Sequence, residues 1–339
     1  MQLLRQLKLM PWAELVDDNA QQLAYALIKK IQACDDVGAE NLLTQSADEN
    51  RERLVYGFSL SPGSLEHAKG WVTRKPQSAF AHTVLGATLI QEGWRIRGCN
   101  YADDVADKDW GPFLEKLGEA HNALQRATEL DSQFADAYAW MIHAGVGSGE
   151  EAPQLKAWFD AAVAREPLHW GAHDKYFMSV THKWGGSHKE MFAFARASAQ
   201  KGGKKSLLNT LLPMAYAELA LAESSRKNIK AAEAKLRHPS YAKELTLALY
   251  QWLGCKPDQL EERLLDVSGP FRGTALNHFA AMLYLTGAKK EARAVCQALN
   301  GQIEQMPWAW LAHGPRERLA AGFVFDRACR KLHVPYKRA

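Results

Sequence analysis

The sequence has no long apolar segment. No run of residues approaches the roughly 18 apolar residues that a helix needs to cross a bilayer. The first residues, Met-Gln-Leu-Leu-Arg-Gln-Leu-Lys, place charges inside a short apolar stretch and lack a small-residue cleavage site. We therefore expect no membrane segment and no signal peptide, which favours a cytoplasmic protein.

Cysteine is scarce and unpatterned. The chain has five cysteines among 339 residues, no two of them in a C-x-x-C arrangement. An odd number of scattered cysteines in a protein without a predicted signal peptide favours reduced thiols over a disulfide framework. We expect free thiols at Cys34, Cys99, Cys255, Cys296 and Cys329.

The common catalytic motifs are also missing. There is no G-x-S-x-G for a serine nucleophile, no H-E-x-x-H for zinc and no G-x-x-x-x-G-K-[ST] for nucleotide phosphates. His169 and His173, four residues apart, are the best metal candidates, but ordinary surface or seam histidines explain them better. We therefore predict no metal, no cofactor and no enzymatic activity.

What the sequence does contain is a helical repeat. Two sets of residues share the spacing four, three, five at an offset of 35 residues, close to the 34-residue period of helix-turn-helix tetratricopeptide arrays. They are Ala120, Leu124, Ala127 and Ser132, followed by Leu155, Phe159, Ala162 and Pro167. Such units bury their apolar faces only by stacking. We predict an all-α fold, an α-α superhelix of tetratricopeptide-like helical repeats.

The repeat pattern also suggests an organisation. It returns at residues 276–299, with Phe279 and Leu283 predicted at helix seams. We divide the chain into an N-terminal helical segment (1–77), repeats (78–205), and C-terminal repeats ending in a capping helix (206–339). In the first repeat, the register of Leu85-Gly86 places the alanine of the second helix at position 98. The alanine is found at Ala120, which is 22 residues later, and this excess predicts an inserted loop at 94–111.

A glycine-rich turn interrupts the later helices. The segment is Lys183-Trp184-Gly185-Gly186-Ser187. Ser187, with Glu190 three residues later, forms a capping box that predicts the start of the next helix. Backbone N–H groups at such a turn, with Lys183 and Lys189, could hold an anion. A tight turn with Trp184 as a packing anchor is the simpler interpretation.

Three short sequence segments resemble those of a known family. Trp94-x-x-Arg97-Gly98, Arg165-Glu166-Pro167 and the Lys183–Ser187 turn resemble a bacterial family of uncharacterised tetratricopeptide-like domain proteins, over about residues 40–210. The resemblance carries no activity with it. It implies binding of a peptide or partner protein in a groove. The chain departs from the repeat consensus at Ser132, at His143 and in the insertion. The residues that line the groove in that family therefore cannot be assigned to this chain by position.

The two halves of the chain differ in net charge, which bears on the partner each could bind. Residues 1–160 carry a net charge of −8 and residues 161–339 a net charge of +12. The basic half would favour an acidic partner. Our leading hypothesis is a non-enzymatic adaptor or scaffold, or an inhibitor that neutralises a cognate toxin. The alternatives are an enzyme with a site around 94–110 and 170–188, and a weak nucleic-acid binder through the basic half.

The predicted partner site joins the insertion to the turn. Both interrupt helix pairs, and Asp103, Asp104, Asp107 and Asp109 in the insertion are opposite in charge to the lysines of the turn. We expect them to lie close together and to form one rim of the binding surface. The predicted contact residues are Trp94, Arg97, Trp110, Lys183, Trp184 and Lys189.

Overall fold

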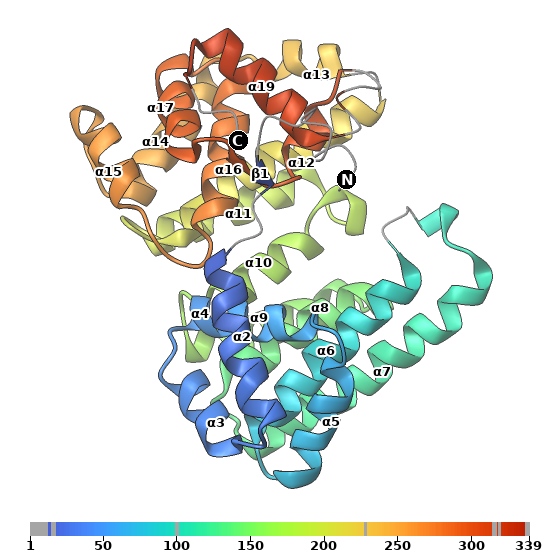
Figure 1. Ribbon diagram of the computed structural model, residues 1–339. Helices are drawn as coiled ribbons and strands as arrows, with labels where there is room; N and C mark the ends of the chain where they lie inside the picture. The colour runs from blue at the N-terminus through green and yellow to red at the C-terminus, as the bar shows by residue number, and fades with distance from the viewer. Residues whose placement is uncertain are drawn as a thin grey trace, which may run out of the picture. The chain divides into compact units, whose positions relative to one another are not determined.

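The computed structural model is all-α, as predicted (Figure 1). It describes residues 13–14, 18–98, 102–226, 229–313, 317 and 320–335. Within these residues the only strands are β1 (Ala13–Glu14) and β2 (Gln302–Ile303), which pair in parallel with Ala13 opposite Gln302. No helix in this part of the chain is both long and apolar enough to cross a membrane.

The chain forms two compact units. One contains residues 18–180 and is called here the 18–180 unit; the other, the C-terminal unit, contains the chain from Thr181 onward together with β1. The division at 180/181 differs from the boundaries drawn from the sequence at 77/78 and 205/206. Helices on both sides of residue 77 share one buried core in the 18–180 unit.

The 18–180 unit is a succession of short helices joined by tight turns. Its helices are α2 (Asp18–Gln32), α3 (Asp36–Thr44), α4 (Asp48–Ser59), α5 (Ser64–Arg74), α6 (Ala79–Arg97), η1 (Ala102–Asp104), α7 (Asp107–Leu130), α8 (Ala135–Ser148), α9 (Ala152–Arg165) and α10 (Trp170–Ser179).

The C-terminal unit has the same character. Its helices are η2 (His182–Trp184), α11 (His188–Gly202), η3 (Leu207–Thr210), α12 (Leu211–Arg226), α13 (Ile229–Leu236), α14 (Pro239–Leu253), η4 (Pro257–Gln259), α15 (Leu260–Asp266), α16 (Arg272–Thr286), α17 (Lys289–Leu299), η5 (Trp308–Leu311) and α19 (Ala321–Leu332). The capping helix was predicted from residue 316 and begins at Ala321.

Serine caps begin two of the predicted helices. The Ser78 hydroxyl accepts a hydrogen bond from the Ala81 N–H at the start of α6, and that of Ser187 accepts from the Glu190 N–H at the start of α11. The sequence also favours Ser64 as a helix cap, which is wrong. Gly63, with φ of 73°, takes that position, and the Ser64 hydroxyl donates to the Ser59 carbonyl instead.

The predicted seam residues are buried. Phe159 keeps 8% of its surface exposed, and the others keep none: Ala120, Leu124, Ala127, Ala162, Phe279 and Leu283. The register across the insertion is also confirmed. A Cβ atom on Gly86 would lie 2.5 Å from Leu124 and 3.3 Å from the Ala120 carbonyl. Glycine at position 86 therefore lets α6 and α7 approach where the sequence pairs them.

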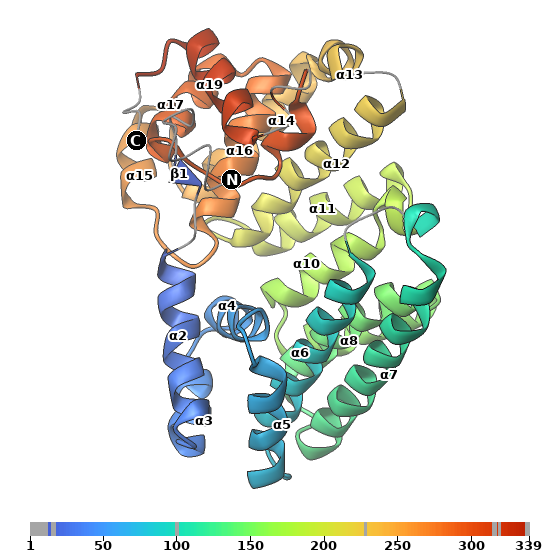
Figure 2. The same cartoon turned by 45° about the vertical axis from the view of Figure 1, so that its right-hand side comes forward.

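The inserted loop predicted at 94–111 is mostly helix. Beyond the Gly86–Ala120 contact, α6 continues to Arg97 and α7 starts at Asp107, so residues 94–97 and 107–111 are helical. The two helices run antiparallel to the tip of this hairpin (Figure 2). An insertion of 22 residues amounts to about six helical turns, and sharing these turns between the two helices preserves their pairing.

The hairpin holds together through apolar contacts along its length. Phe113 and Leu117 of α7 are buried, and a Cβ on Gly93 of α6 would lie 3.3 Å from the Phe113 ring. Proline is favoured in the first turn of a helix, so the sequence alone would start α7 at Pro112, but α7 already begins at Asp107. Because Pro112 is exposed, water can solvate the carbonyl that its missing N–H leaves without a helical bond.

Candidate functional site

Three of the six predicted contact residues gather at the hairpin tip. The Arg97 guanidinium carbon lies 5.2 Å from the centre of the Trp94 ring and 5.4 Å from that of Trp110. Trp94 and Arg97 are three residues apart on α6, so they share a helix face, and Trp110 approaches from α7. The sequence thus identified an aromatic and cationic cluster, although it placed these residues in a loop.

Phe113 anchors this cluster to the unit. Its ring centre lies 5.1 Å from that of Trp94 and 6.0 Å from that of Trp110. A Cβ on Gly147, near the end of α8, would lie 3.2 Å from both Phe113 and Trp94. The close approach of α8 therefore fixes one side of the cluster, while Trp94 and Trp110 stay half-buried.

The other three predicted residues lie in the C-terminal unit. The Lys183 ammonium is 2.6 Å from Oε1 of Glu218 and 5.6 Å from the centre of the Trp310 ring. Trp184 ends η2 half-buried, and Lys189 is exposed in the first turn of α11. Lys183 thus has a carboxylate partner in its own unit, whereas the sequence had paired it with the insertion. The proximity of the insertion to the turn stays a prediction.

The structure also contains a polar network that the sequence analysis missed. Arg51 of α4 donates to both oxygens of Asp136 on α8, at 3.2 and 3.1 Å, and its Nη2 lies 2.9 Å from Oε1 of Glu166. Its Nη1 donates to the Ser46 carbonyl at 2.9 Å. Only 2% of the Asp136 side chain and 12% of the Arg51 side chain are exposed. Arg51 therefore links three separate segments of the 18–180 unit.

His169 completes this network from the turn between α9 and α10. Its Nδ1 accepts a hydrogen bond from the Ala172 N–H at 3.1 Å, and its Nε2 lies 3.6 Å from Oδ2 of Asp136. Burial by itself would lower the pKa of His169, but the Asp136 carboxylate outweighs burial and raises it. Burial would likewise raise the pKa of Asp136, and His169 and Arg51 lower it to about 2.

Asp48 binds the start of α10. Its Oδ2 accepts a hydrogen bond from the Trp170 N–H at 2.7 Å. A carboxylate at a helix N-terminus is favourable because the first N–H groups have no partner within the helix. This contact joins α4 to α10 across 122 residues of sequence.

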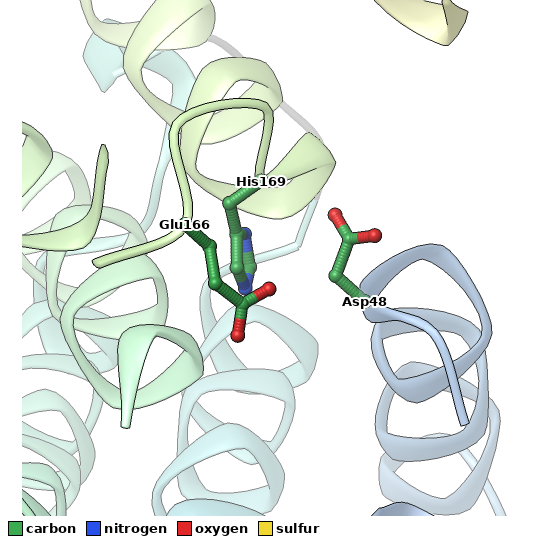
Figure 3. A group of neighbouring side chains, drawn as sticks. All are labelled: Asp48, Glu166 and His169. Atoms are coloured by element: carbon green, nitrogen blue, oxygen red, sulfur yellow. The ribbon is translucent and has the colours of Figure 1, made fainter. Parts of the chain in front are cut away.

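Asp48, Glu166 and His169 are the group that could hold a metal ion (Figure 3). Within the described residues, each offers one donor atom, and these atoms lie within 4.8 Å of one another. Two of the donors are nevertheless engaged. Glu166 binds the Arg51 guanidinium, and Asp48 accepts the Trp170 N–H. A second cation beside Arg51 would also be repelled, so this set fits an ion network better than a metal.

The pair suggested by sequence, His169 with His173, does not converge on one point. His173 Nε2 lies 3.3 Å from the Pro167 carbonyl oxygen, to which it donates, and its ring meets Phe159 edge-on at 5.1 Å. His173 is not part of the three-residue group above. The absence of a metal stays a prediction.

A second buried ion pair lies in the same unit. Lys175 of α10 donates to Oε1 of Glu52 on α4, and its ammonium lies 4.1 Å from the centre of the Trp140 ring. His143 stacks beside Trp140 at 5.8 Å; burial, aided by Lys175, lowers the pKa of His143 to about 3. Burial raises the pKa of Asp174 to about 6, with Glu52 adding to the rise.

Chemically, the two groups work as internal counter-ions between α4, α8 and α10. Their central side chains, Asp136, Glu52 and Lys175, are buried. One sequence signal could have revealed them: Glu52 shares a helix face with the buried Val55 and Ser59, at spacings of three and seven. A charged residue within such a face needs a buried partner.

Comparison with known proteins leaves the family open. No protein-family model matches the chain, and no curated protein shows significant similarity to it. The functional argument therefore rests on the geometry of the hairpin tip and of the buried ion network.

Proposed function

We propose that this protein is a non-enzymatic, tetratricopeptide-like adaptor that binds a protein partner. The consecutive helix pairs with buried seams at a 35-residue offset support this proposal, because stacked repeats of this kind present extended binding surfaces. The buried ion network also supports a binding role, since its central charged groups are paired with one another between helices.

One observation carries the proposal: the α6–α7 hairpin ends in an aromatic and cationic cluster. Trp94, Arg97 and Trp110 stack around Phe113 and stay partly exposed at the tip. Leu114, one turn beyond Trp110, keeps 44% of its surface exposed. Tryptophan and arginine are the residues that most often dominate binding energy at protein interfaces. We therefore assign partner contact to this tip.

Affinity capture with matched variants tests the proposal. Full-length wild type, Trp110→Ala and Lys201→Ala are immobilised, and proteins retained from the native cell are identified by mass spectrometry. A candidate partner is then purified and its dissociation constant measured. We expect Trp110→Ala to weaken binding by at least about tenfold, or 1.4 kcal/mol, and Lys201→Ala, at an exposed helix end, to leave it unchanged.

Thermal unfolding of each variant separates binding from folding. If Trp110→Ala keeps the wild-type melting temperature and full affinity for every retained protein, the tip has no binding role. If it loses stability with unchanged affinity, the cluster is structural.

A further inference from the structure

The outer face of α7 is open along the hairpin. Every residue on this face is exposed, and the members recur at the helical spacings of three, four and seven. They are Lys108, Gly111, Leu114, Glu115, Gly118, Asn122 and Gln125.

Two glycines on this face have no packing partner among the described residues. A Cβ on Gly111 or on Gly118 would meet no atom of that part of the chain within 4 Å, whereas one on Gly86 or Gly93 of α6 would press on α7. Glycine is the least favourable residue in a helix interior after proline. Both glycines also have helical φ angles, so no unusual backbone conformation requires them. What glycine offers here is room for another backbone to approach closely.

Leu114 gives the same face an apolar centre. It lies between the two glycines and is 44% exposed, with the half-buried Trp110 one turn before it. An apolar side chain flanked by small residues fits the narrow apolar stripe of a helix.

The charge around the face specifies the partner. Residues 102–119 contain six carboxylates and two lysines. Lys108 is exposed and Lys116 is held by Glu119 at 2.6 Å, while Asp104, Asp107 and Glu115 are exposed, so acidic groups are in the majority. On α6, Arg97 lies against the aromatic rings. The surface potential at the tip therefore favours a cationic partner.

We propose that the outer face of α7 docks a basic amphipathic helix of a partner protein. This inference rests on the proposed adaptor function and names the chemistry of the partner. The helix lies with its narrow apolar stripe over Leu114, its backbone near Gly111 and Gly118, and its lysines and arginines toward the acidic tip. It differs from the sequence-based expectation of an acidic partner for the basic half of the chain, because it concerns the other unit.

A designed peptide provides the probe. It has about 18 residues, or about five turns, with alanine and leucine on one narrow stripe and lysine elsewhere. Two control peptides carry glutamate in place of lysine, or the same lysine-containing composition without helical periodicity. Binding of each labelled peptide to the full-length chain is measured by fluorescence anisotropy at low and at physiological salt.

The variant that tests close approach is Gly118→Leu. Its Cβ would meet no described atom within 4 Å, and Ala157→Leu, at an exposed position of α9, is its matched control. We expect the basic amphipathic peptide to bind wild type and Ala157→Leu equally. Gly118→Leu should weaken binding at least tenfold, and Glu115→Lys should weaken it most at low salt, where charges are least screened.

Three outcomes would overturn the inference. In the first, the basic and acidic peptides bind equally well. In the second, Gly118→Leu binds the basic peptide as tightly as wild type does. In the third, no peptide binds, and the chain associates with itself in a way that Gly118→Leu abolishes. If no peptide binds but a partner is still captured in a Trp110-dependent manner, the docking inference fails and the adaptor proposal stands.

Discussion

The Lys175 ammonium lies 2.5 Å from Oε1 of Glu52, a residue 123 positions earlier in the chain. The exposed fractions of the two side chains are 5% and 9%. Removing one member of such a pair leaves a charge buried without its partner, which typically costs about 3–5 kcal/mol. We therefore expect Lys175→Met and Glu52→Gln each to lower the free energy of unfolding by about that amount in urea titration.

The double variant is the control for this pair. Lys175→Met with Glu52→Gln removes both charges, so it should be far more stable than the sum of the single effects predicts. If each single variant costs less than about 1 kcal/mol, the pair is solvated and our account of α4–α10 packing is wrong.

A core truncation tests the repeat register. Phe159 stacks on Tyr176 of α10 at 4.6 Å and keeps 8% of its surface exposed. Phe159→Ala should lower the free energy of unfolding by about 3–5 kcal/mol. The comparison is Leu168→Ala, a residue with 46% of its surface exposed, which should change stability by less than about 1 kcal/mol. Equal effects would show that the seam is misassigned.

Replacement by alanine should change the free energy of unfolding in opposite directions at two glycines of the hairpin. Gly118→Ala should raise the free energy of unfolding by about 0.5–1 kcal/mol, because alanine favours the helix and its Cβ meets no atom. Gly86→Ala should lower it, because its Cβ would come within 2.5 Å of the buried Leu124. Thermal and urea unfolding measure both, and stabilisation by Gly86→Ala would contradict the α6–α7 contact.

The His169–Asp136 contact should make stability depend on pH. Because the folded pKa of His169 is raised above the unfolded value of about 6.5, the charged imidazole contributes stability that is complete below that pH. Protonation of Nδ1 removes its hydrogen bond from the Ala172 N–H, and the attraction of Asp136 outweighs that loss. This contribution is lost as pH rises through the folded pKa. We expect the stability difference between wild type and His169→Asn to shrink from pH 6 to pH 9.

The contributions of the other titrating groups cancel when wild type is compared with His169→Asn, because both proteins contain them. Asparagine retains the ability to cap α10, and Asp174, with its pKa raised to about 6, titrates in both proteins. A stability difference that stays constant across this range would show that the pKa of His169 is the same in the folded and unfolded protein, and a difference that grows would show that His169 is neutral in the folded protein.

The thiols should all be free. Cys34, Cys255, Cys296 and Cys329 are unpaired in the structure, with the last two buried, while Cys99 lies outside the described residues. We expect an aromatic disulfide reagent to titrate five thiols in denatured, unreduced protein, and fewer before unfolding. A count of three in the denatured protein would indicate a disulfide.

Much of the fold could be predicted because its signals are local. Periodic apolar residues identified most helices, and the spacing around Ala120 and Phe159 identified the buried seams. The helical insertion escaped prediction because Gly98, Gly111 and Pro112 are typical helix breakers. In the structure, contacts of Phe113 and Leu117 with the rest of the hairpin outweigh those local preferences.

The candidate site was only partly predictable for a different reason. Trp94 and Arg97 are neighbours on one helix face, so their cluster has a sequence signature. Arg51 and Asp136 are 85 residues apart, and Arg51 and Glu166 are 115 apart. Such pairings depend on how helices stack, and a single sequence holds no periodic signal for them.

The pairing of β1 with β2 affects the order in which the protein can fold during synthesis. Ala13 is made before the whole 18–180 unit, yet its partner Gln302 is made near the end. Since chains are synthesised from the N-terminus and domains fold as units, the 18–180 unit can complete its core while the ribosome is still adding the C-terminal unit. The first strand cannot pair until Gln302 has been made, so β1 joins its unit only after the 18–180 unit has had time to fold.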